Sequence, residues 1–420
     1  MSQESAVSQE PATPQRSVGE PVAKMTASRR STLLGAMFLM ATSAIGPGFI
    51  TQTTAFTVQL GAAFAFAIAL SILVDIALQM NVWRIIGVTG RRAQELGNLV
   101  FPGLGWAMAV LLLFGGLVFN VGNVAGAGLG TDAMFGLDPR LGGVLSAVIA
   151  IGIFSSRRAG VAIDRIVVVL GLVMIALTSF IAVSSNPPVG RALRNVVLPE
   201  QVSFLAITTL IGGTIGGYIV YAGAHRLLDS GLSGPEHVTA ISRGSILGIV
   251  LTGIMRIVLF LAIFGVVAGG AVLDPANPAA SAFGQAAGEV GLRVFGVVLW
   301  AAAITSVIGA SYTTVTFVTS RTRTSERTRT ILVCAFIAFT TLVFVSVGTP
   351  PTTLLIFAGA FNGLLLPFGI AVLLWVATRR ADLFQGYVYP KWLLVIGWLA
   401  WLLTLYLAAK SVGPVIELFV

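Results

Sequence analysis

ATSAIGPGFITQTT, residues 41–54 of the chain, places Gly46-Pro47-Gly48 in the middle of an apolar run long enough to cross a lipid bilayer. Proline lacks a backbone N–H donor and glycine weakens a helix, so we expect an interruption at this point. In hydrocarbon, the freed backbone groups are tolerated only where protein or a water-filled cavity satisfies them. The stretch therefore predicts a discontinuous transmembrane helix.

The composition of the whole chain indicates a membrane protein with many spans. Its 420 residues are 56% hydrophobic and only 10% charged, whereas soluble proteins carry roughly 25% charged residues. The single cysteine, Cys334, excludes a disulfide framework, and two histidines disfavour a histidine-built metal site. No nucleophile–base pair stands out, so we expect no enzymatic activity and no cofactor.

Apolar runs of about 18–25 residues predict an all-α membrane protein with about 11 transmembrane helices. Residues 1–30 are polar and are expected to form a disordered cytoplasmic tail, followed by a transporter domain over 31–410 and a short tail over 411–420. The predicted spans are 33–58, 61–82, 104–130, 142–154, 161–183, 203–229, 244–268, 292–318, 330–347, 353–376 and 391–410.

The basic residues set the expected orientation. With the N-terminus inside, nineteen of the 25 Lys and Arg residues lie on the cytoplasmic side and five on the other, and Arg256 lies within a span. This asymmetry follows the positive-inside rule and predicts a bacterial inner (plasma) membrane protein with an extracytoplasmic C-terminus. The net charge of +9 therefore reports membrane topology and not a nucleic-acid partner.

A second weak point lies five spans after the first. The sixth span contains Gly212-Gly213-Thr214-Ile215-Gly216-Gly217-Tyr218. Interrupted helices at corresponding places in two halves are typical of inverted-repeat transporters with a binding site at the midplane. We therefore expect repeats at about 33–183 and 203–376, with an extra helix at about 391–410. The alternative is that these glycines only allow helices to pack closely.

These features resemble the natural resistance-associated macrophage protein (Nramp) family of proton-coupled divalent-metal transporters. That family has the leucine-transporter-like (LeuT) fold, in which helices 1 and 6 of a 5+5 inverted repeat are unwound. The resemblance covers roughly residues 31–410. The residues that keep the family's spacing are Pro47, Gly48, Gly61, Gln79, Arg84, Thr89, Gly90, Leu366, Pro367 and Phe368.

The chain departs from the family at the metal site, as a divergent bacterial branch without the metal-binding motifs. Where the family has Asp-Pro-Gly-Asn, this chain has Gly46-Pro47-Gly48-Phe49, and where the family has Met-Pro-His-Asn it has Val220-Tyr221-Ala222-Gly223. The acidic pair of the family's third span is replaced by Asn120 and Asn123. Gly359 stands near the position of its span-10 glutamine, with Asn362 one turn away.

These replacements predict a different cargo. A dehydrated divalent metal ion needs anionic or soft ligands, whereas the N-terminus of a half-helix attracts a carboxylate. We therefore expect a secondary active transporter, working by alternating access as a monomer, for a small organic acid or amino-acid-like solute. Resemblance to family branches associated with 5-oxoproline (pyroglutamate) utilisation suggests that compound. Two alternatives remain open: a transporter of Mg²⁺ or Mn²⁺, and a non-transporting sensor or scaffold.

Polar and aromatic groups near the two interruptions are the candidate ligands. Hydroxyls and amides one turn after a break can face a cavity or bond their own backbone, and a tyrosine can stack on a planar ring. No residue is assigned to a metal. The candidate substrate-binding residues are Ser43, Gly46, Gly48, Phe49, Gln52, Thr53, Asn123, Thr214, Gly217, Tyr218, Tyr221 and Asn362.

Charged and hydroxyl groups inside other spans are candidates for the pathway or for coupling. Asp75 and Arg256 lie at mid-membrane depth, where charges mark functional sites by default, although the two can also neutralise each other or Arg256 can snorkel. The coupling ion is expected to be H⁺ or Na⁺, and the hydroxyl-rich eighth span suits the latter. The candidates are Asp75, Asn120, His225, Arg256, Ser306 and Tyr312.

Overall fold

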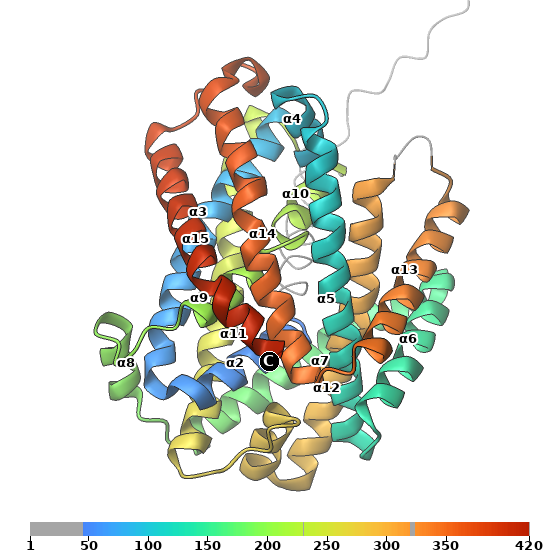
Figure 1. Cartoon of the computed structure of the whole chain (residues 1–420), viewed down its shortest axis with the longest axis vertical. Helices are drawn as coiled ribbons and strands as arrows, with labels where there is room; N and C mark the ends of the chain where they lie inside the picture. The colour runs from blue at the N-terminus through green and yellow to red at the C-terminus, as the bar shows by residue number, and fades with distance from the viewer. Residues whose placement is uncertain (1–44, 230, 320–323, 420) are drawn as a thin grey trace, which may run out of the picture.

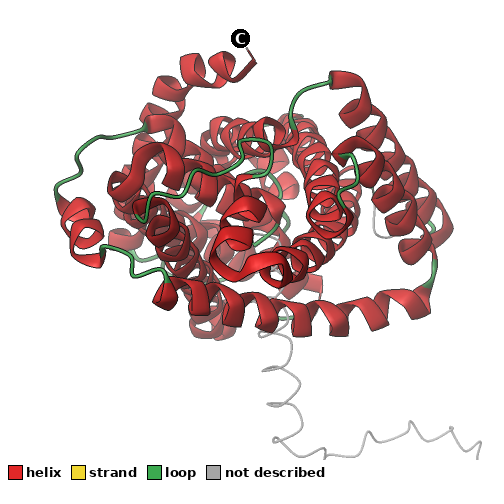
Figure 2. Cartoon of the chain, turned by 90° about the horizontal axis from the view of Figure 1, so that it is seen from below, coloured by secondary structure: helices red, strands yellow, loops and turns green. Residues whose placement is uncertain are grey.

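The computed structural model describes residues 45–229, 231–319 and 324–419 (Figure 1). Residues 157–168, Arg226 and Asp229 are described by their backbone alone. The expected tail over 1–30 and the candidate Ser43 lie outside the described residues. Within them the chain is helical and contains no strand (Figure 2).

Each predicted span overlaps a described helix. The helices are α2 (Pro47–Leu60), α3 (Phe64–Thr89), α4 (Ala93–Val100), α5 (Leu104–Phe135), α6 (Pro139–Ser155), α7 (Arg157–Ser184), α8 (Val189–Val197), α9 (Phe204–Ile215), α10 (Ile219–Asp229), α11 (Val238–Ala268), α12 (Pro278–Val318), α13 (Glu326–Val347), α14 (Pro351–Arg379) and α15 (Lys391–Ile416). Helix α15 thus continues beyond residue 410, where the hydropathy pattern places the end of the last span.

The number of about 11 transmembrane helices is not confirmed. Eight stretches of the described residues are long and apolar enough to cross a membrane, and the bent pair Val169–Ser184 and Val189–Val197 brings the number to nine. Helices α2 and α3 are joined by only three residues and count as one stretch, Pro47–Thr89, and α6 is only 17 residues long. The length and hydropathy of the described helices therefore do not resolve them into the 11 predicted spans.

The sixth span is broken where its glycines predict a break. Helix α9 ends at Ile215, Gly216 is extended, Gly217 has a positive φ of 54°, and α10 begins at Ile219. A left-handed residue ends a helix at little cost only if it is glycine. The Trp83 indole N–H donates to the Val220 carbonyl at 3.0 Å, so that α3 satisfies a carbonyl in the first turn after the break.

The described part of the first span begins at its Gly-Pro-Gly element, and the interruption expected there stays a prediction. Gly46 is extended, and Pro47 is the first residue of α2. Proline suits this position because its missing N–H would have no partner inside the helix. Residues before Ile45 lie outside the described part, so the structure shows the second half of the span. The N-termini of α2 and α10 both lie at the breaks, and a helix N-terminus carries a partial positive charge.

Helix α5 lies at the centre of the bundle, in contact with α12, α14 and α6, while α6 and α13 form one edge (Figure 1). Helix α14 packs along α9 through glycines. A Cβ on Gly212 would lie 2.0 Å from the Gly359 carbonyl oxygen, and one on Gly363 would lie 2.4 Å from the Thr208 carbonyl oxygen. For these glycines, close packing is the reason for the residue, as the alternative interpretation expects.

The periphery is apolar and exposed. Large side chains such as Leu141 on α6, Leu172 on α7, Leu342 on α13 and Leu399 on α15 are exposed. Such a surface suits lipid and not water. The chain is therefore a membrane protein whose outer helices face the bilayer.

Candidate functional site

The start of α2 lies against two polar side chains from other helices. A Cβ on Gly46 would lie 3.0 Å from the Ser306 hydroxyl of α12 and 3.9 Å from the Asn123 carbonyl oxygen of α5. The Ser306 hydroxyl is buried and has no hydrogen-bond partner among the described residues. Three elements thus bring the candidates Gly46, Asn123 and Ser306 together at the first break.

Gln52, one turn into α2, connects the first span to two others. Its Nε2 donates to the Leu355 carbonyl of α14 at 2.8 Å, and it is fully buried between Gly48, Gly213 and Gly359. Its Oε1 has no partner among the described residues. Gln52 therefore fixes α2 against α9 and α14 and keeps one acceptor at the breaks.

The second break is lined by Asn362 and Tyr218. Asn362 of α14 donates to the Gly115 carbonyl at 3.1 Å, while its Oδ1 lies against Gly217 without a hydrogen-bond partner. The Tyr218 ring meets Phe119 edge-on, with 5.9 Å between centroids. An aromatic pair and an amide oxygen thus border the point where α9 ends.

Arg256 of α11 reaches both broken spans. Its Nη1 donates to the Thr214 hydroxyl of α9 at 2.9 Å, and its guanidinium carbon lies 4.4 Å from the ring centroid of Phe49 in the first turn of α2. Arg256 is only 2% exposed, so it does not snorkel to the membrane surface. Asp75 of α3, 1% exposed, is the acidic neighbour that acts on it, beside the same Thr214 hydroxyl.

One edge of the Arg256 guanidinium is unpartnered. Its Nε and Nη2 are buried and find no acceptor among the described residues. This edge binds both oxygens of a carboxylate in two exposed pairs of the same chain. Arg191 holds Glu200 through Nε and Nη2 at 3.1 and 2.9 Å, and Arg380 holds Asp382 in the same way at 2.9 and 2.8 Å. The free edge of Arg256 therefore has the donor arrangement of a bidentate carboxylate site.

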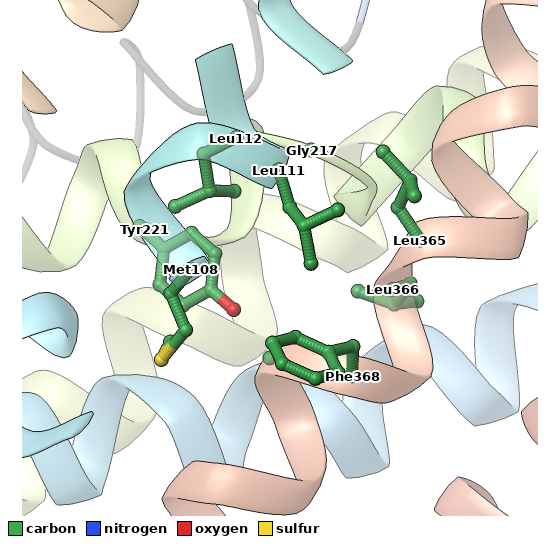
Figure 3. Close-up of a pocket in the computed structure, with 9 residues that line it drawn as sticks. Met108, Leu111, Leu112, Gly217, Tyr221, Leu365, Leu366 and Phe368 are labelled. Atoms are coloured by element: carbon green, nitrogen blue, oxygen red, sulfur yellow. The ribbon is translucent and has the colours of Figure 1, made fainter. Parts of the chain in front are cut away.

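A groove lies beside the second break, with Gly217 among its lining residues (Figure 3). Its empty volume is about 330 Å³, part of which is open to solvent. Met108, Leu112, Leu366 and Phe368 are among its lining residues, and Tyr221 directs its hydroxyl into it. Its walls are mainly apolar, from α5, α10 and α14. Tyr221 is the polar side chain that this groove offers near the break.

His225 belongs to a buried cluster one turn beyond Tyr221. The Ala93 N–H lies 3.4 Å from its Nε2, and its ring lies 5.2 Å from that of Phe317 on α12. His225 is buried and contacts α4 and α12, so it does not form a solvated helix end. The side chains of its neighbours Arg226 and Asp229 lie outside the described residues.

Three candidates have contacts that lead away from the breaks. Thr53 donates to the Phe49 carbonyl of its own helix at 2.7 Å. Asn120 donates to Thr340 of α13 at 2.8 Å, a contact that locks two helices together. Tyr312 is 43% exposed and packs on Phe154 of α6. It is six residues from Ser306, which turns it to another face of α12. The structure does not bring Tyr312 to the breaks, and its pathway role stays a prediction.

Several groups at the breaks escape sequence reasoning. The Leu355 carbonyl that accepts from Gln52 is a backbone group, and no residue type marks it. Phe119 and Trp83 are ordinary apolar residues of long spans, although they contact Tyr218 and Val220. A tryptophan in the middle of a span needs a partner for its N–H, and that requirement is the one available signal.

A many-helix bundle with one span broken at Gly216–Gly217, and with polar side chains collected there and at the start of α2, is the arrangement of the LeuT-like fold. The chain belongs to the Nramp family, described as natural resistance-associated macrophage protein-like, whose sequence profile matches residues 37–413. The family consists of transporters, so the expectation of no enzymatic activity is confirmed.

Two relatives are similar over nearly their whole length. The uncharacterized membrane protein YcsG of Bacillus subtilis (strain 168) is 50% identical over 378 residues, which cover 89% of this chain and 93% of YcsG. An uncharacterized membrane protein of Haemophilus influenzae is 48% identical over 391 residues, which cover 93% of this chain and 98% of that protein.

Solved structures of low identity share the fold. A manganese transporter from Eremococcus coleocola, in complex with an aromatic bis-isothiourea substituted compound, has a TM-score of 0.72 at 17% identity and covers 96% of this chain and 90% of its own. MhsT in complex with L-phenylalanine has a TM-score of 0.65 at 15% identity and covers 92% of this chain and 98% of its own. Both likenesses concern the fold alone.

Proposed function

We propose that this transporter is a secondary active carrier of a small organic acid, with 5-oxoproline as the specific candidate. The carrier would work by alternating access as a monomer, with its N-terminus in the cytoplasm. The observation that supports this cargo is the edge of the Arg256 guanidinium that finds no acceptor among the described residues, on a side chain that contacts Thr214 of α9 and Phe49 of α2. Such an edge matches the two oxygens of a carboxylate.

Electrostatics at the breaks supports the same cargo. Two unit charges about 4 Å apart interact by roughly 4 kcal/mol at an effective dielectric constant of 20, so Arg256 attracts an anion and repels a divalent cation about twice as strongly. The N-termini of α2 and α10 add partial positive charge at the starts of these two helices. The edge-to-face pair of Phe119 and Tyr218 offers an aromatic wall for a flat ring such as that of 5-oxoproline.

A divalent metal ion, Mn²⁺ or Mg²⁺, is the second candidate cargo. The comparisons support it more than they support an organic acid, because they place the chain in the Nramp family and beside a manganese transporter. Within the structure, the Asp75 carboxylate, with Oδ1 unpartnered among the described residues, is the group that suits a cation. MhsT, which shares the fold, is in complex with L-phenylalanine, and this ligand has a carboxylate as the first candidate cargo does.

A binding experiment on purified protein separates the two cargoes. Thermal unfolding and calorimetry would be measured with L-5-oxoproline and a panel of small carboxylates, and separately with Mn²⁺ and Mg²⁺. A ligand at 100 times its Kd stabilises the folded state by about 2.7 kcal/mol, which raises the Tm by several degrees. We expect stabilisation by a carboxylate. Stabilisation by a metal ion and by no carboxylate would overturn the organic-acid proposal.

Variants of Arg256 test whether a carboxylate binds at the Arg256 guanidinium. Removal of one partner from a buried charged hydrogen-bonded pair costs about 2–5 kcal/mol, so Arg256→Gln is expected to weaken carboxylate binding by roughly 30-fold or more. Arg256→Lys, which keeps the charge without the planar fork, is expected to fall between wild type and Arg256→Gln. The matched control is Arg84→Gln, another buried arginine, which bonds Ser242 at 2.6 Å, and we expect it to bind as wild type does.

A further inference from the structure

Asp75 is a buried acidic residue, and the binding of an anion at Arg256 does not by itself give it a role. Its Oδ1 has no hydrogen-bond partner among the described residues, and it lies in α3 beside Thr214 at the end of α9. A buried, ionised carboxylate is costly unless it is paired, so its charge needs an explanation.

Asp75 and Arg256 do not form a closed ion pair. Their charged atoms are not within 4.0 Å of each other, and the Thr214 hydroxyl is the group that both approach. Arg256 thus keeps its free edge for another acceptor while Asp75 balances its charge from a short distance. Arg256 is therefore available to exchange one counter-ion for another.

A substrate carboxylate on Arg256 would put two negative groups beside one positive group at a buried position. Like charges that share a buried site do not both stay ionised, so one carboxyl group takes up a proton. The substrate carboxylate occupies the bidentate edge of Arg256, and Asp75 has an unpartnered oxygen. Protonation of Asp75 restores one negative charge against one positive charge.

Resting on the organic-acid function proposed above, we infer that Asp75 carries the proton that is co-transported with the substrate anion. In the outward-open state the anion binds Arg256 and one proton from the outer solution binds the Asp75 carboxylate. In the inward-open state the anion and the proton leave together, and Asp75 becomes the counter-ion of Arg256 again. One negative and one positive charge move, so each cycle is electroneutral.

Several other titratable groups on the elements that pack against α3 contact residues other than Asp75. Arg256 is the charged group that acts on Asp75. His225 of α10 contacts Ala93 and Phe317, and Lys410 of α15 lies over Tyr406. The remaining contacts are those of Arg191 with Glu200, Arg380 with Asp382, Arg84 with Ser242 and His237 with Ser233 and Glu236.

The pH dependence of binding tests this role. L-5-oxoproline stays ionised above pH 5, because α-carboxyl groups titrate near pH 3.3–3.7. Uptake of one proton with each anion makes affinity rise as the pH falls, by at most about 10-fold per unit. We expect this slope between pH 5 and 8 in wild type and in Asp75→Glu, and a flat profile at the high-affinity level in Asp75→Asn. A slope retained in Asp75→Asn, or binding lost at every pH, contradicts the assignment.

A measurement on wild type alone guards against a variant that does not fold. Calorimetry in buffers of different ionisation enthalpy counts the protons taken up with L-5-oxoproline, and we expect about one per anion near the middle of the pH range. A count of zero at every pH contradicts the role of Asp75 even when the anion binds. Absence of carboxylate binding in wild type contradicts the organic-acid function instead, so the two failures are distinguishable.

Transport in proteoliposomes separates coupling from binding. Asp75→Asn is expected to exchange labelled for unlabelled 5-oxoproline at a rate near that of wild type, and to lose accumulation driven by a pH gradient. Exchange needs no net proton movement, whereas accumulation does. Accumulation driven by a Na⁺ gradient and indifferent to the pH gradient would assign coupling to Na⁺ and overturn the proposal.

Discussion

At the scale of the residue, Gly217 shows why one glycine is indispensable where others only save space. Its φ is 54°, and a Cβ would lie 2.2 Å from the Asn362 Oδ1. The sequence predicts a break somewhere in the glycine-rich stretch, but Gly212, Gly213, Gly216 and Gly217 look alike in it. Only the structure separates Gly212, which lies on the Gly359 carbonyl, from the residue that turns the chain.

Gly217→Ala is expected to lower the free energy of unfolding and to impair substrate binding. A non-glycine residue in a left-handed conformation costs roughly 1–2 kcal/mol, and displacement of Asn362 adds to it. Chemical denaturation and carboxylate binding would be measured side by side. The matched control is Gly171→Ala on α7, where an added Cβ meets nothing within 4 Å and alanine favours the helix. Equal behaviour of the two variants would contradict the role given to Gly217.

Arg256 marks the limit of prediction for single residues. Its place in the middle of a span marks it as either a functional charge or a structural one. Contact with Phe49 and Thr214, which are 207 and 42 residues away along the chain, depends on how α11 is rotated against α2 and α9. Hydropathy says little about that rotation, because apolar residues occur on every face of α11.

At the scale of the element, the helices follow hydropathy closely and the breaks follow Gly and Pro. Predicted ranges such as 104–130 and 353–376 differ from α5 and α14 by a few residues. The short helix α8 (Val189–Val197) lies outside the predicted spans, because its nine residues include two arginines. It is held at its end by Glu200, which binds Arg191 and accepts from Asn195.

The attachment of α8 is expected to depend on pH. The hydrogen bonds from Arg191 and Asn195 hold the pKa of Glu200 below its usual value. Since this pKa is lower in the folded state, the stabilisation is present above the pKa of the unfolded chain and is lost as the pH falls through the folded value. Glu200→Gln should therefore lower the Tm slightly at pH 7, and this difference should shrink as the pH falls.

The effect of Glu200→Gln is expected to be small, because the pair is exposed and screened by salt. Measurement at low and high ionic strength provides the check, and Asp382→Asn, which removes another exposed pair with an arginine, is the control for the general effect of a lost surface charge. A Tm difference that grows toward pH 3 would show that the interaction has another origin.

At the scale of the whole molecule, basic links that are far apart in the sequence lie at the same end of the bundle. The link from α3 to α4 and the link from α14 to α15 lie at one end of the bundle, while α8 lies toward the other (Figure 1). Arg380 donates to the Leu99 carbonyl of α4 at 2.9 Å, so the link from α14 to α15 contacts the helix that follows the link from α3 to α4. The single-sequence pattern predicts sidedness, but not which loops meet.

Cysteine labelling in intact cells tests the orientation. In a Cys334→Ser background, Val272→Cys is expected to react with a membrane-impermeant maleimide from outside, whereas Val388→Cys should react only after the membrane is opened. Both positions are in loops and are 88% and 85% exposed, so accessibility within the protein is matched. The charge asymmetry predicts this result. Labelling of Val388→Cys in sealed cells would reverse the assigned topology.

The glycine contacts between α9 and α14 constrain how such a molecule changes shape. Backbone atoms of the two helices lie so close at Gly212 and Gly363 that neither helix slides past the other without a collision. The Gln52 bond to the Leu355 carbonyl adds the start of α2 to the same block. The Gly216–Gly217 turn separates α10 from this block, so a change of shape that keeps these contacts would move α10 relative to α9.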